Sequence, residues 1–165
     1  MAMIDELLFI KQFREKKAEK EFQNARLALA EAKKAEETAT QTLNAFQLQA
    51  ELDELAWYRD LCARVVKPRE IADVQEDVAM LRATEQMHAN VLQKAEQQHA
   101  SALAAQVQAN LLMREASKAR EKFTELASNY HLIEAKEAER KEELELEEVS
   151  GNIRKKDDWA VEADV

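Results

Sequence analysis

Residues 18–39 have the sequence AEKEFQNARLALAEAKKAEETA, and residues 95–116 have the sequence AEQQHASALAAQVQANLLMREA. Each stretch begins and ends with alanine and repeats alanine at every seventh position. A seven-residue repeat places residues of one kind along one face of a helix, which is typical of a coiled coil. The two stretches therefore predict two helices that pack together through small side chains.

The seven-residue repeat extends well beyond the alanines, as two series four residues apart in each half of the chain. In the first half the series are Leu8, Glu15, Phe22, Leu29, Glu36, Leu43, Ala50 and Trp57, with Ile4, Lys11, Ala18, Ala25, Ala32, Ala39, Phe46 and Asp53. In the second half they are Thr84, Val91, Gln98, Ala105, Leu112, Ala119, Leu126 and Ile133, with His88, Ala95, Ala102, Ala109, Ala116, Phe123, Tyr130 and Glu137. Repeats sustained over this length predict two long helices.

The two alanine series mirror each other along the chain. When Ala18 is paired with Ala116, and each later alanine with its counterpart, the two residue numbers always add up to 134, which places a turn at residue 67. Pro68 is the only proline, and proline favours the first position of a helix. The sequence therefore predicts an all-α, antiparallel two-helix coiled-coil hairpin, with helices at about residues 3–65 and 68–150 and a turn at about residues 66–68.

The pairing also predicts which side chains form the interface between the helices. They are Ala18, Phe22, Ala25, Leu29, Ala32, Ala39, Leu43, Val91, Ala95, Ala102, Ala109, Leu112, Ala116, Phe123 and Leu126. Residues beyond about 133 have no counterpart in the first helix, so they should form a helical overhang. Ser150 and Gly151 resemble a helix stop. We therefore expect one hairpin domain over residues 1–151 and a disordered tail over residues 152–165.

The composition restricts the class of protein. The chain has 165 residues with 1 Gly and 1 Pro, too few turn residues for a sheet protein. A net charge of −9 argues against a nucleic-acid partner, which needs a basic surface. Nothing approaches the roughly 20 apolar residues of a membrane span, and Asp5 and Glu6 stand where a signal peptide is basic. We expect a cytoplasmic protein without direct membrane insertion.

Residues suited to catalysis or metal binding are sparse. The single Cys62 excludes a disulfide within one chain, and His88, His99 and His131 do not follow metal-site spacing. The sequence also lacks a phosphate-binding glycine loop and a nucleophile motif. We therefore predict no catalytic residues, no metal and no cofactor, and a protein that is not an enzyme.

Positive charge is concentrated on two facing stretches of the predicted hairpin, residues 11–34 and 100–123, between acidic regions. The cluster consists of Lys11, Arg14, Lys16, Lys17, Lys20, Arg114, Lys118, Arg120 and Lys122. A solvated coiled-coil surface is one interpretation. The other is a surface complementary to an acidic partner, since patterned charge steers association.

Aromatic and apolar residues gather near the predicted turn. The cluster consists of Trp57, Tyr58, Arg59 and Leu61. Trp57 and Tyr58 are adjacent, so both cannot face the partner helix. The cluster either closes the end of the hairpin or forms a contact patch, where aromatic residues and arginine supply much of the binding energy.

Two terminal segments carry a family resemblance. Near the start, LFIK at residues 8–11 is followed by RE at 14–15 and AE at 18–19. Near the end, REKF at residues 120–123 and Leu126 precede EAERKEELELEE at residues 137–148. These segments resemble the ends of the type III secretion stalk proteins of the YscO/FliJ family, and the second one is closer to the YscO-like, injectisome branch.

The resemblance implies a hairpin similar to the rotor stalk of rotary ATPases, at the cytoplasmic face of a secretion apparatus. It implies a stalk that inserts into the hexameric secretion ATPase and contacts the export-gate membrane protein. Translocator or effector chaperones are further implied partners. From position and charge, we assign the basic cluster to the ATPase and the cluster near the turn to the gate or a chaperone.

Two other classes of protein remain open at this point. A coiled-coil scaffold or stator-like structural protein would form higher oligomers, whereas a hairpin that buries its own apolar stripe predicts a monomer. A helical chaperone or adaptor would bind its clients without any ATPase.

Overall fold

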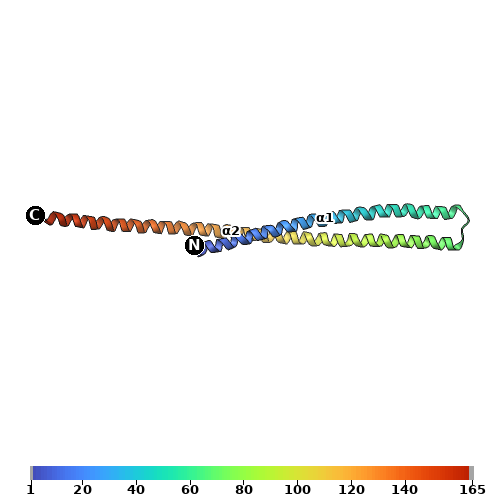
Figure 1. Ribbon diagram of the computed structural model, residues 1–165, viewed down its shortest axis with the longest axis horizontal. Coiled ribbons are helices and arrows are strands. Elements are labelled where there is room, and N and C mark those ends of the chain that lie inside the picture. Colours follow the sequence, from blue (N-terminus) through green and yellow to red (C-terminus); the bar gives the residue numbers. More distant parts are fainter. Residues whose placement is uncertain (1, 164–165) are drawn as a thin grey trace. The chain divides into compact units, whose positions relative to one another are not determined.

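The computed structural model describes the backbone of residues 2–163 and the side chains of residues 2–157 and 159. Helix α1 (Met3–Ala63) and helix α2 (Pro68–Ala163) are joined by residues 64–67 (Figure 1). No strand occurs in the described part of the chain. The predicted all-α two-helix hairpin is confirmed. The chain divides into a hairpin unit, Ala18–Met113, and a terminal unit, Met1–Lys17 with Arg114–Val165.

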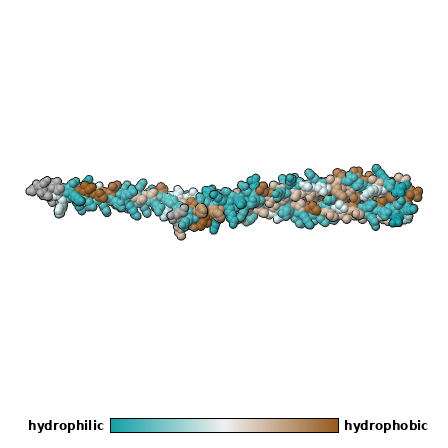
Figure 2. All heavy atoms as spheres, viewed as in Figure 1, coloured by the Kyte–Doolittle hydropathy of each residue, from teal (hydrophilic) through white to brown (hydrophobic). Residues whose placement is uncertain are grey.

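Alanine forms the most buried layers of the hairpin unit. Its buried side chains belong to Ala32, Ala39, Ala50 and Ala102, each with 8% or less of its surface exposed. Small side chains let two helices approach to the low end of the usual ~8–10 Å axis separation. Because burial of a methyl group contributes little hydrophobic free energy, contacts beside the alanines must add to the stability of the pair. Figure 2 shows that hydrophobic side chains also reach the surface along the paired helices.

The seam between the helices agrees with the sequence analysis on the α1 side. Every position of the two predicted series from Ile4 to Trp57 is buried or half-buried. On α2 the alanine series is also buried or half-buried from His88 to Phe123. Within α2, this series becomes exposed at Tyr130, and the overhang follows His131, which still pairs with Asp5 of α1.

The second predicted series of α2 lies one residue away from the observed seam. Three predicted interface residues are exposed, namely Val91, Leu112 and Leu126, at 55%, 45% and 43%. The more buried residues are the ones that follow each of them, namely Leu92, Met113 and Ala127. Both members of each neighbouring pair are apolar, so hydrophobicity could not decide which one faces α1. The three interface predictions are corrected accordingly.

Local hydrogen bonds define the connection between the helices. Pro68 opens α2, and the Lys67 backbone N–H donates to Glu70 Oε2 at 3.2 Å, which is half of a capping box. The guanidinium of Arg64 bridges Asp60, at 3.2 Å, and Glu70, at 3.3 Å. These contacts link the end of α1 to the first turn of α2. Helix α1 ends at Ala63, slightly before the expected residue 65.

The C-terminal end of α2 differs from the sequence expectation. Helix continues to Ala163, although we expected it to end at about residue 150 and residues 152–165 to be disordered. A helix stop uses glycine at positive φ, and Gly151 does not have positive φ. A single glycine costs only about 1 kcal/mol relative to alanine in a helix, and the residues after it include good helix formers such as Arg154 and Lys155. Residues 164–165 lie outside the described part.

Paired cysteines test the alignment of the two helices. In a Cys62→Ser background, Ala25→Cys with Ala109→Cys should form a disulfide within one molecule, because the mirror pairing places these positions opposite each other. Electrophoresis without reductant and thiol counting by mass spectrometry would detect it.

The matched control combines Ala25→Cys with Ala102→Cys, which is displaced by one heptad, or about 10 Å. This control should keep both thiols reduced. Links found only between separate chains would contradict the hairpin.

Candidate protein-binding surfaces

The terminal unit contains nearly all of the predicted basic cluster. Its members there are Lys11, Arg14, Lys16, Lys17, Arg114, Lys118, Arg120 and Lys122, while Lys20 lies in the hairpin unit. These eight residues fall into two groups. Some contact the opposite helix, and the others are exposed to the solvent.

Two members of the cluster lie in the seam. Lys11 is half-buried, and its Nζ lies 5.1 Å from the centre of the Phe123 ring, a cation–π contact. Arg120 is half-buried as well, and its Nε donates a hydrogen bond to Glu15 Oε2 at 2.6 Å. Both residues therefore join the two helices, so they are poor candidates for partner contacts.

The remaining six members of the basic cluster in the terminal unit are exposed. We call them the basic surface, and they are Arg14, Lys16, Lys17, Arg114, Lys118 and Lys122. Arg114, Lys118 and Lys122 are four residues apart, so they share one face of α2. Lysine and arginine along one helix face make a surface that favours an acidic partner.

Polar pairs across the seam are the contacts that sequence reasoning missed. Glu15 pairs with Arg120, Glu36 pairs with His99, and Gln47 Nε2 donates to Glu85 Oε1 at 3.1 Å. A signal for the first two was present, because Glu15 and Glu36 occupy seam positions of the α1 heptads. Pairing by residue numbers that add up to 134 places residues 119 and 98 opposite them. Each of these is one residue away from the observed partner, Arg120 or His99.

Each of the three histidines contacts the other helix. The His88 ring centre lies 5.0 Å from that of Phe46, and both residues belong to the seven-residue series. His99 meets Glu36, and His131 Nε2 donates to Asp5 Oδ1 at 2.7 Å. The hydrogen bond to Asp5 favours the charged imidazole, so the pKa of His131 is raised above its usual value.

The cluster near the connection divides between seam and surface. Trp57 and Leu61 are half-buried, whereas Tyr58 and Arg59 are exposed. Val65, in the connection, is fully exposed. Tyr58, Arg59 and Val65 form what we call the tip surface, and they combine an aromatic ring, a cation and an aliphatic side chain.

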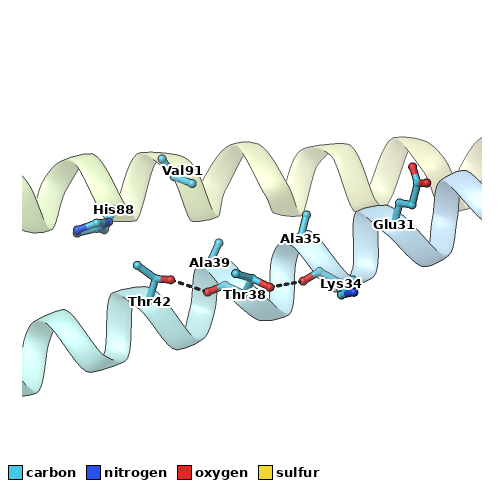
Figure 3. A pocket seen from close by; sticks show the side chains of 8 residues that line it. All are labelled: Glu31, Lys34, Ala35, Thr38, Ala39, Thr42, His88 and Val91. Atoms are coloured by element: carbon cyan, nitrogen blue, oxygen red, sulfur yellow. Dashed lines mark hydrogen bonds between the residues drawn. The ribbon is translucent and has the colours of Figure 1, made fainter.

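A shallow groove of about 470 Å³ lies on one side of the hairpin unit, between α1 and α2 (Figure 3). Thr38 Oγ1 donates to the Lys34 carbonyl at 3.0 Å, and Thr42 Oγ1 donates to the Thr38 carbonyl at 2.9 Å. The hydroxyl protons are therefore used within α1, and the wall contributed by α2 comes from His88 and Val91. The groove is mainly apolar and lacks a cluster suited to catalysis.

The fold and these surfaces define a coiled-coil protein whose exposed faces are charged in some places and apolar in others. Within the described residues, no helix has the length and hydrophobicity needed to cross a membrane. The chain belongs to the type III secretion protein YscO family, whose model matches residues 4–152. It is therefore a type III secretion protein.

A known structure has the same fold. The 2.8 Å crystal structure of the type III secretion protein YscO from Vibrio parahaemolyticus matches with a TM-score of 0.83 and 22% sequence identity. The match covers 88% of this chain and 92% of that one. A search of curated proteins finds no match. At 22% identity, the similarity of the two structures supports a shared fold. The assignment to the family rests on the match of the family model.

The pKa of His131 predicts how stability depends on pH. A raised pKa in the folded state means that the His131–Asp5 contact contributes fully below the usual pKa of 6.5, and that this contribution is lost as the pH rises through the folded-state pKa. Asp5→Asn should therefore lower the thermal midpoint more at pH 6 than at pH 9. Circular dichroism at 222 nm would measure the midpoints.

The control repeats the comparison in a His131→Gln background, where Asp5→Asn should have the same effect at both pH values. An equal effect of Asp5→Asn at pH 6 and pH 9 in the natural sequence would contradict the assignment.

Proposed function

We propose that this chain is the stalk of a type III secretion apparatus, inserting into the hexameric secretion ATPase and linking it to the export gate. Membership of the YscO family supports a place in the apparatus. The basic surface of the terminal unit carries the proposal of an ATPase contact, because it is a local concentration of exposed cations in a chain with a net charge of −9. The stalk would work in the cytoplasm, at the cytoplasmic face of the apparatus.

Electrostatics supports a role for the basic surface in binding rather than in folding. Exposed like charges spaced along a helix do not stabilise it, since neighbours at i and i+4 repel one another. Their value lies in raising the association rate and selecting an acidic partner. The two members of the basic cluster that join the helices, Lys11 and Arg120, lie in the seam and are not part of the basic surface.

The tip surface is our candidate for contact with the export-gate protein or with chaperones. Tyr58 and Arg59 are adjacent on α1, and Val65 follows in the connection. Tyrosine and arginine are among the residue types most enriched in binding hot spots. A scaffold or stator-like role and a chaperone or adaptor role are the alternatives, and a test of ATPase stimulation separates them from the stalk.

Charge reversal tests the basic surface. Lys16→Glu, Lys17→Glu, Arg114→Glu and Lys118→Glu together should reduce stimulation of the secretion ATPase by about tenfold or more, because each change replaces attraction by repulsion. The rate of ATP hydrolysis, measured against the concentration of added chain at low ionic strength, would report it.

A matched control reverses four exposed basic residues elsewhere, at Arg59, Lys67, Arg69 and Lys94. This control should stimulate the ATPase as the natural chain does. Undiminished stimulation by the first variant would exclude the basic surface as the contact, and absence of stimulation by the natural chain would exclude the stalk role.

Substitutions at the tip surface test the second contact. Tyr58→Ala with Arg59→Ala should weaken binding to the cytoplasmic part of the export-gate protein by about tenfold or more, since truncation of a hot-spot residue costs about 2 kcal/mol or more. Calorimetry would measure the affinity. We leave Trp57 unchanged in this variant because its half-buried ring belongs to the seam, so Trp57→Ala should mainly lower the thermal midpoint.

Leu27→Ala provides the control, because Leu27 is an exposed apolar residue of α1 far from the connection in sequence. Equal affinity of the natural chain and the tip variant would reject this assignment.

A further inference from the structure

One stretch of α2 has no charge. Residues 97–113 contain no Asp, Glu, Lys or Arg, although these types make up 35% of the chain. Pairing by residue numbers that add up to 134 places residues 21–37 of α1 opposite this stretch, and there Lys33, Lys34 and Glu37 are exposed. The uncharged surface therefore belongs to α2 alone, and it lies within the hairpin unit.

This stretch of α2 is apolar on two faces. Ala102 and Ala109 face α1 as part of the seam. A second stripe, at spacings of four, three and four residues, consists of Ala100, Ala104, Val107 and Leu111. All four are exposed, Val107 by 51% and Leu111 by 50%. Helical geometry places this stripe on the side of α2 away from α1, and a helix that is apolar on two faces is suited to packing against two neighbours.

We propose that the second neighbour is another copy of this chain, paired antiparallel through the outer stripe of α2. In this arrangement Ala100 of one copy lies against Leu111 of the other, and Ala104 lies against Val107. Each layer then combines a small with a larger side chain, which fills space and lets the helices approach closely. The arrangement has twofold symmetry, so each copy uses the same surface.

The lack of charge favours this occupant. An ordinary helix from the surface of this chain would bring lysine or glutamate to the interface, and burying such a group without a partner is costly. The same stretch of a second copy brings only apolar and uncharged polar side chains. Its sequence therefore matches itself both in charge and in the alternation of small and large residues.

The size of the stripe indicates weak pairing. Four layers, each with a half-exposed valine or leucine from one copy and an alanine from the other, bury less surface than the roughly 1,200–2,000 Å² of a stable protein interface. We therefore expect a reversible dimer that dissociates at low concentration. This fits the monomer expected from the hairpin seam, since the seam stays within each chain.

Sedimentation equilibrium of the full chain over a range of concentrations tests the pairing. The natural chain should show a monomer–dimer equilibrium, and Val107→Lys should raise its dissociation constant by about tenfold or more, because it places two ammonium groups at the centre of the contact. Val107 and Leu27 are both exposed in the single chain. Leu27→Lys on α1 is therefore a matched control that should leave the dissociation constant unchanged. Circular dichroism would verify that helix content is equal in all three chains.

Cysteine pairs test the antiparallel arrangement independently. In a Cys62→Ser background, chains with Ala100→Cys mixed with chains carrying Leu111→Cys should form the mixed disulfide. Ala100→Cys chains alone should react slowly, because antiparallel pairing separates the two thiols by about 16 Å along the helix. Preferred links between identical positions would show a parallel pair and overturn the proposal.

Salt separates this contact from the proposed ATPase contact. Because the stripe is uncharged, raising sodium chloride from 0.1 M to 0.5 M should change the dimer constant by less than about threefold, whereas contact through the basic surface should weaken strongly. A chain that stays monomeric at about 1 mM overturns the proposal. The outer stripe would then be a contact for a helix of another protein. The stalk assignment would not be affected.

Discussion

Alanine against alanine is the constraint on which the hairpin depends. It lets α1 and α2 lie close together, but it supplies little hydrophobic free energy for each layer. The specific contacts therefore come from the neighbours of the alanines. In the hairpin unit these include Phe46 against His88 and Glu36 against His99, and in the terminal unit they include Lys11 against Phe123. Aromatic and charged side chains at the edge of a narrow seam contribute what the methyl groups do not.

Much of this architecture could be predicted from the sequence. The heptads of α1, the alanine series of α2 and the position of Pro68 sufficed for the hairpin, because each follows from a repeat or from backbone chemistry. The second seam series of α2 could not be predicted, since Val91 and Leu92 are both apolar and only three-dimensional packing selects between them. The end of α2 was also missed, because Gly151 has the residue type of a stop without its conformation.

The candidate surfaces were predicted less completely than the fold. A count of charges found the basic cluster but could not separate the six exposed residues from Lys11 and Arg120, whose roles depend on partners on the opposite helix. The same applies to Trp57 and Tyr58, which are adjacent in sequence but lie in the seam and on the surface, respectively. Residue type indicates what a side chain can do, and its direction on the helix decides which of those roles it has.

The polar pairs of the seam have a consequence for how the helices stay aligned. A repeat of identical alanines would allow one helix to slide past the other by seven residues and still place methyl against methyl. Such a slide would separate Glu36 from His99 in the hairpin unit and Glu15 from Arg120 in the terminal unit. Half-buried charged groups without partners are costly, so these pairs favour a single register of α1 against α2.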